Sequence, residues 1–256
     1  MFSLICFFIF SYYWHGLGVT IGYHRLLSHR AFKCNKLVEY FWIISGYLAF
    51  EGSPAWWATV HRVHHRNADQ ENDPHSPDRG SGHAYFSWMF KQDEELINIH
   101  KVAPDLMKDP VYRFMAWGDD ALMLTVNVLF RLIIWVCFGW QMALTSLLAG
   151  IFVLQIPLML NLFCHISKLG YKNHNLNNHA VNVWWVALLA AGEGWHNNHH
   201  AHPSSAKSGE RWFEFDLSWN IIQFMHALGL VSRYNLPAVT TTAADRTIVA
   251  GAKITS

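Results

Sequence analysis

The stretch that decides the fold is residues 121–167, ALMLTVNVLFRLIIWVCFGWQMALTSLLAGIFVLQIPLMLNLFCHIS, which holds a single charged residue, Arg131. A helix rises about 1.5 Å per residue and a bilayer core is roughly 30 Å thick, so about 20 residues cross it. The stretch is long enough for two crossings, at about 120–139 and 142–164, with a break near residues 139–141 (Gly-Trp-Gln). It predicts a membrane hairpin.

A third apolar run stands at the N-terminus. Residues 1–23, MFSLICFFIFSYYWHGLGVTIGY, contain no Asp, Glu, Lys or Arg. A secretory signal peptide is excluded because no basic segment precedes the run and no small-residue cleavage site follows it. The run therefore predicts a span, and we expect that an upstream helix is missing or was never present. Over the whole chain 14% of residues are charged, whereas soluble domains carry about 25%.

The distribution of basic residues predicts the orientation. Eleven Lys and Arg lie between Arg25 and Arg113, and seven between Lys168 and Lys253. By the positive-inside rule, residues 24–118 and 168–256 are cytoplasmic, and the hairpin between them crosses and returns. The four cysteines (6, 34, 137 and 164) show no disulfide or CxxC spacing, which indicates a reducing compartment. A net charge of +1 gives no indication of nucleic-acid binding.

Shorter apolar stretches predict helices that lie in the membrane interface, over residues 37–50, 183–191 and 212–231. The last carries a helical stripe of apolar residues: Phe215, Trp219, Ile222, Met225 and Leu228. The fold class predicted is an all-α integral membrane protein of one domain, residues 1–237. Its cytoplasmic cap is formed by 24–118 and 166–237, and residues 238–256 form a polar, disordered tail.

Eight of the 17 histidines fall in three short clusters, HRLLSH at 24–29, HRVHH at 61–65 and HNNHH at 196–200. In HxxHH the histidines stand at i, i+3 and i+4, which share one face of a helix, so three imidazoles can converge on a metal. The HxxxxH spacing instead separates two histidines by roughly 140° around a helix. His24 and His29 can address one site only if they flank it or if the helix unwinds. The predicted topology puts all three clusters on one side of the membrane.

A further pair, Asn161 and His165, lies at i and i+4 at the end of the last span, where a polar residue is a functional candidate. Nine imidazoles exceed the four ligands of a zinc site and suit two ions with four or five each. Imidazole suits Fe, Zn, Cu and Ni alike, so the ligands leave the metal open. Glu193 and Asp73 are interpreted as acceptors that orient ligand imidazoles. The remaining histidines, among them His75, His174 and His202, are interpreted as solvated or structural.

At this point a family resemblance is clear. The three clusters, in this order and with a double-crossing hairpin between the second and third, resemble the membrane fatty-acyl desaturases of the stearoyl-CoA (delta-9) type, in a bacterial-like form. Residues 192–203, GEGWHNNHHAHP, are similar to the family pattern GEGWHNxHHxxP, and residues 73–75 match its DPH. The resemblance covers roughly residues 5–235.

The resemblance implies a centre of two iron ions above a hydrophobic tunnel for the acyl tail. It implies a reaction that consumes O2, two electrons and two protons and inserts a cis double bond, commonly at carbon 9. Asn161 matches the residue that reaches one iron through water. The implied iron ligands are His24, His29, His61, His64, His65, His165, His196, His199 and His200.

Some features depart from the family. We count three crossings where the family usually has four. Thr59 and Val60 stand where acyl-CoA enzymes of animal type carry Arg-Asp, which argues against CoA recognition and favours a bacterial-type or acyl-lipid enzyme. The expected acyl carrier is therefore CoA or a membrane lipid, with the lipid favoured. The sequence carries no fused cytochrome b5 segment, so we expect a separate electron donor such as ferredoxin or cytochrome b5. Phe8 and Tyr12, three to four turns from His24, are candidates for closing the tunnel, and lipid-facing aromatics are the alternative.

Two other functions compete with desaturation. A related di-iron membrane hydroxylase or ketolase would use the same ligands, and only the fate of the substrate would differ. A metal carrier or sensor would need polar groups inside the spans to pass the ion, and residues 121–160 offer little beyond Arg131.

Overall fold

The regular secondary structure of the described residues is almost entirely helical, which confirms the predicted fold class. The structure is a computed structural model, and it describes residues 1–237, so the predicted tail lies outside the described residues. In chain order the elements are α1 (Phe2–Leu17), η1 (Gly18–Ser28), β1 (Phe32–Cys34), α2 (Lys36–Tyr47), α3 (Pro54–Asn67), η2 (Pro77–Arg79), α4 (Ser81–Tyr85), η3 (Ser87–Phe90), α5 (Ile99–Val102), η4 (Leu106–Lys108), α6 (Pro110–Phe138), α7 (Trp140–Phe163), η5 (Ser167–Leu169), α8 (Trp184–Leu189), α9 (His196–Ala201), α10 (Leu217–Ala227) and β2 (Val231–Tyr234).

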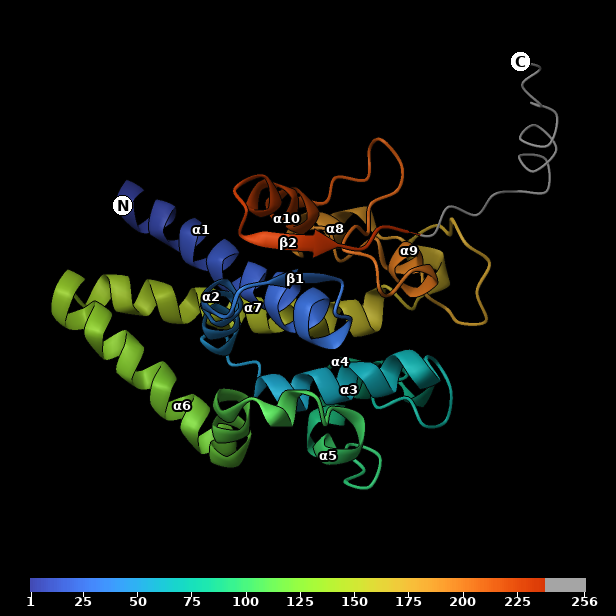
Figure 1. Cartoon of the computed structure of the whole chain (residues 1–256), viewed down its shortest axis with the longest axis horizontal. Coiled ribbons are helices and arrows are strands. Elements are labelled where there is room, and N and C mark those ends of the chain that lie inside the picture. The colour runs from blue at the N-terminus through green and yellow to red at the C-terminus, as the bar shows by residue number, and fades with distance from the viewer. Residues whose placement is uncertain (238–256) are drawn as a thin grey trace, which may run out of the picture.

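Within residues 1–237, three helices are long and apolar enough to cross a membrane: Phe2–Ser28, Pro110–Phe138 and Trp140–Phe163. The second is broken at Asp119, whose φ of 45° and ψ of −148° are not helical, so its apolar part starts where the sequence places the span. Between α6 and α7 the chain turns at Gly139, with a φ of 91° that a glycine adopts without strain. Figure 1 shows α6 and α7 joined at one end and α1 lying along α7.

The one charge inside the hairpin faces the protein interior. Arg131 is buried, donates to the carbonyl of Leu48 at 2.7 Å and lies 4.9 Å from the ring of Phe50. Val136 on α6 and Phe152 on α7 are instead exposed, as expected for side chains that meet lipid. Carbonyl and amide oxygens accept from both terminal nitrogens of the guanidinium, and aromatic rings face it, so most of the charged group is shielded from the hydrocarbon although its Nε has no partner among the described residues.

The first span continues from α1 into η1 and packs tightly on α2. A Cβ added at Gly18 would lie 2.2 Å from the backbone nitrogen of Gly46. Only glycine permits this approach, which brings α2 against η1. Asn35 caps α2 by accepting from the backbone N–H of Val38 at 3.0 Å.

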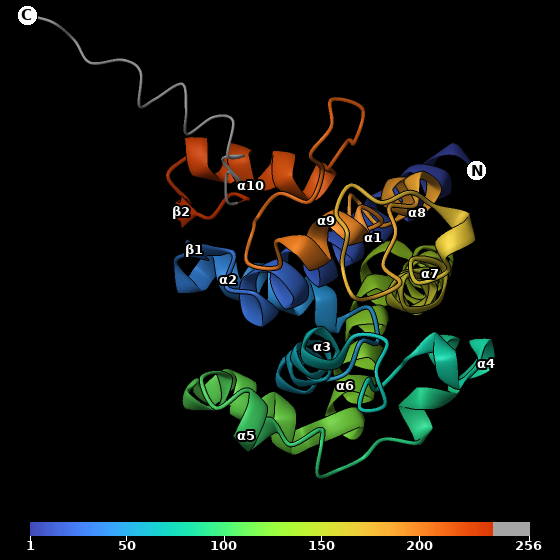
Figure 2. The ribbon, with the colours of Figure 1, turned by 90° about the vertical axis from the view of Figure 1, so that its right-hand side faces the viewer.

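The segments that follow the spans fold over the end of η1. Figures 1 and 2 show α3 on one side of η1 and α9 and α10 on the other. The strand β2 pairs antiparallel with β1, so the C-terminal part of the described chain returns to the segment after η1. Thr20 on η1 and Ser218 on α10 are joined by a hydrogen bond of 2.8 Å.

The predicted stripe of residues 212–231 is divided between two environments. Only Leu217–Ala227 is helical, because Asp216 starts the helix by accepting from the N–H of Trp219 at 2.9 Å. Trp219, Ile222 and Met225 are buried, whereas Phe215 and Leu228 are more than half exposed.

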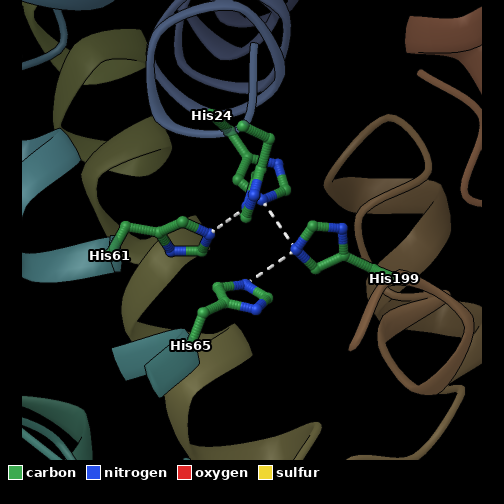
Figure 3. Close-up of side chains that lie close together, drawn as sticks. His24, His61, His65 and His199 are labelled. Atoms are coloured by element: carbon green, nitrogen blue, oxygen red, sulfur yellow. Dashed lines mark hydrogen bonds between the residues drawn. The ribbon is translucent and has the colours of Figure 1, made fainter. Parts of the chain in front are cut away.

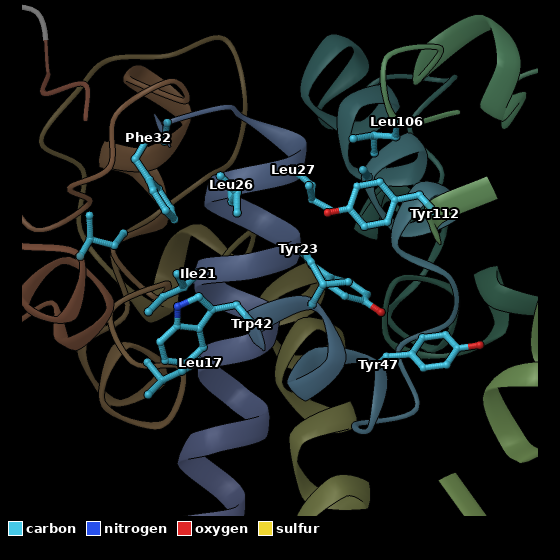
Figure 4. Packing of buried hydrophobic residues seen from close by; sticks show 14 of the residues in the cluster. Leu17, Ile21, Tyr23, Leu26, Leu27, Phe32, Trp42, Tyr47, Leu106 and Tyr112 are labelled. Carbon is cyan, nitrogen blue, oxygen red and sulfur yellow. The ribbon is translucent and has the colours of Figure 1, made fainter. Parts of the chain in front are cut away.

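The main core joins η1 to α2, α3 and α10 (Figure 4). Ile21 and Tyr23 are fully buried, and Trp42 donates its indole N–H to the sulfur of Met225. The core thus fixes η1, which carries the first histidine cluster, against the elements that carry or support the other two.

Candidate metal centre

The first histidine cluster lies in a π-helix. In η1 the N–H of His29 bonds the carbonyl of His24 at 3.1 Å, five residues earlier. Residues five apart lie closer to the same face of such a helix than of an α-helix, because its hydrogen bonds join residues five apart. The ring centroids of His24 and His29 are 4.8 Å apart. Of the two possibilities that the spacing left open, the structure shows the unwound helix.

The second cluster lies on an ordinary α-helix. Ser53 caps α3 and Pro54 stands in its first turn, both favourable at a helix start. His61, His64 and His65 share one face, as their spacing predicts. Arg62, between them, donates to Asp105 at 2.7 Å and to the carbonyl of Leu27 at 2.7 Å, and so ties α3 to η1.

The third cluster lies on the short helix α9, which is held by its two asparagines. The Oδ1 of Asn197 accepts from the backbone N–H groups of Asn173 and His174, both at 2.8 Å. Asn198 donates to Glu214 at 2.8 Å and accepts from Asn182 at 2.8 Å. The spacing drew attention to the histidines of HNNHH and missed these asparagines, which fix the helix that presents them. The available signal in the sequence was a pair of adjacent asparagines between ligand candidates.

All nine predicted ligand histidines come together in two groups. The five-histidine group is His24, His29, His61, His65 and His199. The four-histidine group is His64, His165, His196 and His200. In each group the ligand atoms lie within 4.8 Å of one another. Figure 3 shows four members of the five-histidine group approaching one point from η1, α3 and α9.

The ring nitrogens that face each other have the chemistry of a metal site. His24 turns Nδ1 to Glu193 (2.6 Å) and Nε2 to Nε2 of His199 (3.1 Å). A neutral imidazole that gives its one proton to a carboxylate presents a bare lone pair on the other nitrogen. His199 Nε2 also lies 2.9 Å from Nε2 of His65, and it can donate to only one of them. A cation at the centre would take every lone pair.

The four-histidine group shows the same arrangement. His64 turns Nδ1 to Asp73 (2.9 Å), and His165 turns Nδ1 to Asp69 (2.9 Å). Their Nε2 atoms face Nε2 of His200 at 3.3 Å and of His196 at 3.0 Å. The residues therefore fit metal ions in both groups, with histidine tautomers fixed from outside.

Three carboxylates supply those outer contacts, and the sequence analysis named two of them. Glu193 and Asp73 lie as expected, beside His24 and His64. Asp69 was missed, although it stands in the same acidic loop as Asp73. Its φ of 60° turns the loop there, and its backbone N–H donates to Asp73 at 2.8 Å. No spacing rule connects Asp69 with His165, which lies 96 positions away in the sequence.

The titration behaviour favours neutral ligands. Burial, reinforced by neighbouring histidines, lowers the pKa of His61, His65, His196, His199 and His200 well below the usual value. Burial alone would raise the pKa of Glu193, but the charges of Arg25 and His24 outweigh it and hold that pKa below its usual value. Neutral imidazoles beside ionised carboxylates are the forms that bind metal.

A mostly apolar cavity touches both groups. Its apolar wall includes Val19, Trp57, Ile156 and Leu160, and its polar residues are Thr20, His24, His61, His64, Asn161, Glu193 and His196. Asn161 thus lies at the cavity beside the four-histidine group. Phe8 and Tyr12 are not among the lining residues. Tyr12 packs on the cluster that contains Val19 and donates to the carbonyl of Leu189 at 2.9 Å.

The remaining histidines separate into different environments. His75 packs its ring 4.3 Å from that of His64 and is buried, so it supports a ligand candidate rather than meeting solvent. His174 and His202 lie 5.1 Å apart, ring to ring, outside the two groups.

Comparison with known proteins gives a consistent result. Residues 1–240 match the sequence model of the fatty acid desaturase family. The chain is 34% identical to the sn-1 stearoyl-lipid 9-desaturase of Anabaena variabilis, over 88% of this chain and 81% of that protein. It is 37% identical to a protein of the same name from Synechocystis sp., over 88% and 69%. It is 35% identical to the acyl-CoA C20 Delta5-desaturase of Anemone leveillei, over 86% and 70%.

Proposed function

The chain belongs to the fatty acid desaturase family, and from this premise we propose that it inserts a cis double bond at carbon 9 of a saturated acyl chain carried by a membrane lipid. It is a membrane desaturase and therefore an oxidoreductase. The position of the double bond, the lipid that carries the acyl chain and the identity of the metal are the proposed parts. The observation that carries the proposal is the convergence of nine histidines on two points beside an apolar cavity.

Two iron ions are the proposed cofactor, one in each histidine group, with Asn161 reaching the ion of the four-histidine group through water. A methylene of an acyl chain has no acidic proton, so no side-chain base can remove its hydrogens. When bound, iron would supply the O2 chemistry that this step needs, and the protein supplies position.

The residues around the cavity perform that positioning. Trp57 lines the cavity, stacks on His61 at 5.1 Å and donates its indole N–H to Glu51 at 3.2 Å. This contact holds the indole beside the histidines, where it excludes water and fixes the passing methylenes. We place the far end of the acyl tail near Tyr12, because Tyr12 packs on the apolar cluster that includes Val19 of the cavity wall. Phe8 packs on Tyr12 from the side away from His24, with ring centroids 6.3 Å apart.

A lipid carrier is favoured over CoA by the residues before the second cluster. Thr59 and Val60 are buried and uncharged, and the hydroxyl of Thr59 donates a hydrogen bond to the carbonyl of Ala55 at 2.7 Å. These positions therefore offer no charged group to the phosphates of CoA. The names of the two bacterial relatives, both stearoyl-lipid 9-desaturases, support the same choice.

We place the histidine clusters on the cytoplasmic side, where a separate donor delivers electrons. A cavity of about 310 Å³ beside His29 is lined by three guanidinium side chains, those of Arg30, Arg62 and Arg66. Asp105 neutralises part of this charge by pairing with Arg30 and Arg62. The remaining positive charge suits a donor with an acidic surface, such as a ferredoxin or cytochrome b5.

The test is expression in a host that lacks unsaturated fatty acids, with double bonds located by mass spectrometry of the lipids. We expect carbon-9 cis products in intact lipids, and none from His64→Ala. In membranes, labelled stearate on a glycerolipid should react and labelled stearoyl-CoA should not. Reaction of the CoA ester alone would refute the lipid carrier. Unchanged lipids, with iron-loaded protein in the membrane and a working donor, would refute the proposed reaction.

A further inference from the structure

A third group of metal-ligand side chains lies outside the two histidine groups. It consists of His174, on the segment between η5 and α8, His202, just after α9, and Glu210. Nε2 of His174 lies 2.9 Å from both carboxylate oxygens of Glu210, and Nε2 of His202 lies 3.9 Å from one of them. The two imidazole rings stand nearly perpendicular, at 89°, with centroids 5.1 Å apart.

We propose that His174, His202 and Glu210 form a third, separate site for a divalent transition-metal ion of the zinc type. Around a tetrahedral ion with bonds of about 2.0 Å, ligand atoms lie about 3.3 Å apart. The distances of 2.9 and 3.9 Å bracket that value, so small rotations of the side chains suffice. Two imidazoles and one carboxylate favour zinc, cobalt or nickel over calcium or magnesium.

The burial of the three side chains fits an ion that exchanges with solution. Their side chains are 28%, 18% and 24% exposed in the order His174, His202 and Glu210, so water can supply a fourth ligand. The nine histidines of the paired groups are not needed for this site. The third site can therefore be tested separately from iron binding and from the proposed reaction.

The site also joins the segment that covers His200. The amide of Asn178 lies 3.4 Å from Nδ1 of His200, and Lys172 donates to the carbonyl of Asn178 at 2.7 Å. His174 lies between these two residues. An ion bound to His174, His202 and Glu210 would fasten this segment to the chain that follows α9, and so hold the cover over the four-histidine group.

Zinc uptake by the iron-loaded protein tests the site. Purified protein is dialysed against zinc, and zinc and iron are then counted per chain. We expect one zinc to be bound with iron retained, and this zinc to be lost in His174→Asn, His202→Asn and Glu210→Gln. His100→Asn, which changes an exposed histidine elsewhere, should keep it. Equal uptake by all variants, or no uptake by the wild type, would overturn the proposal.

Two further measurements do not depend on how well the variants fold. Cobalt added to the iron-loaded wild type should give the visible absorption of a four-coordinate ion without thiolate, and calcium should not compete. Iron removal by a chelator should slow several-fold when zinc is added to the wild type. A six-coordinate cobalt spectrum would overturn the proposed site. An unchanged rate of iron removal would overturn the proposal that the bound ion holds the segment around Asn178 over the four-histidine group.

Discussion

In the proposed centre of two ions, replacing Asp69 by Asn should weaken binding of the ion in the four-histidine group and leave binding of the other ion unchanged. The carboxylate of Asp69 is 3% exposed and accepts from Nδ1 of His165 at 2.9 Å and from the backbone N–H of His179 at 2.7 Å. An amide keeps one acceptor oxygen and loses the charge that holds the His165 tautomer. Losing such an outer partner costs about ten- to a hundredfold in metal affinity, or roughly 1.4–2.7 kcal/mol.

The size of the effect is consistent with the hydrogen bond itself. Bonds to a charged group contribute about 1.5–3 kcal/mol, and Asp69 is ionised because His165 and the neighbouring N–H groups hold its pKa below the usual value against the effect of burial. His165 belongs to the four-histidine group, whereas the five-histidine group is oriented through Glu193. Only the four-histidine group should therefore lose affinity for its ion.

The assay is iron content per chain during competition with a ferrous chelator. Asp69→Asn should release one of the two proposed ions at a chelator concentration roughly ten- to a hundredfold lower than the wild type needs for the same ion, and it should release the other ion at the wild-type concentration. Glu71→Gln, an equal change of charge on an exposed side chain of the same loop, is the control. If Asp69→Asn retained both ions as the wild type does, or lost both equally, the division into two separately oriented groups would be refuted.

Four other changes test separate parts of the structure. Tyr12→Ala should let longer acyl chains be desaturated, as seen in product lengths, whereas Tyr13→Ala, on the more exposed side of α1, should not; equal product profiles would contradict a tunnel that ends at Tyr12. Arg66→Glu should slow reduction by an acidic donor roughly tenfold at low salt, and high salt should remove the difference; the same rate at every salt concentration would place donor docking elsewhere. Gly18→Ala should destabilise the protein by roughly 1–3 kcal/mol, because its Cβ would lie 2.2 Å from the backbone of α2, while Gly82→Ala meets nothing within 4 Å and should be neutral in thermal unfolding. The metal-free protein should unfold more easily as the pH falls below about 6.5, because burial keeps the pKa of seven cluster histidines below that value in the folded state. The unfolded chain then binds protons first, and the free energy of unfolding falls by up to about 1.4 kcal/mol per histidine and pH unit. An unfolding temperature that does not change with pH would show that the histidines are solvated.

The sequence predicted the spans and the ligand candidates because both depend on local patterns. Arg131 alone interrupts the hairpin, and the i, i+3, i+4 spacing of His61, His64 and His65 needs only the geometry of one helix. The first cluster shows the limit of such rules. Its spacing is wrong for an α-helix, and the π-helical turn between His24 and His29 is not encoded by a residue preference.

Contacts between distant segments were the least predictable part of the site. Asp69 reaches His165 across 96 positions, and Asn197 fixes α9 by holding the segment that starts at Asn173. His174 and His202 lay in no common motif, and only the fold puts Glu210 between them. These residues are polar groups satisfied by tertiary structure, so their partners depend on how the loops close.

The outer carboxylates also bear on how a buried site made of neutral ligands would hold the two proposed metal ions. Imidazoles bind without cancelling charge, and an uncompensated buried charge costs several kcal/mol. Glu193 and Asp216 both pair with Arg25, so much of their charge is already balanced. Within the described residues, neither Asp69 nor Asp73 forms an ion pair with a Lys or Arg, and both lie against histidines of the four-histidine group. The four-histidine group therefore has the more negative surroundings. We expect the protein to stabilise a higher positive charge on the ion of this group more than on the ion of the five-histidine group.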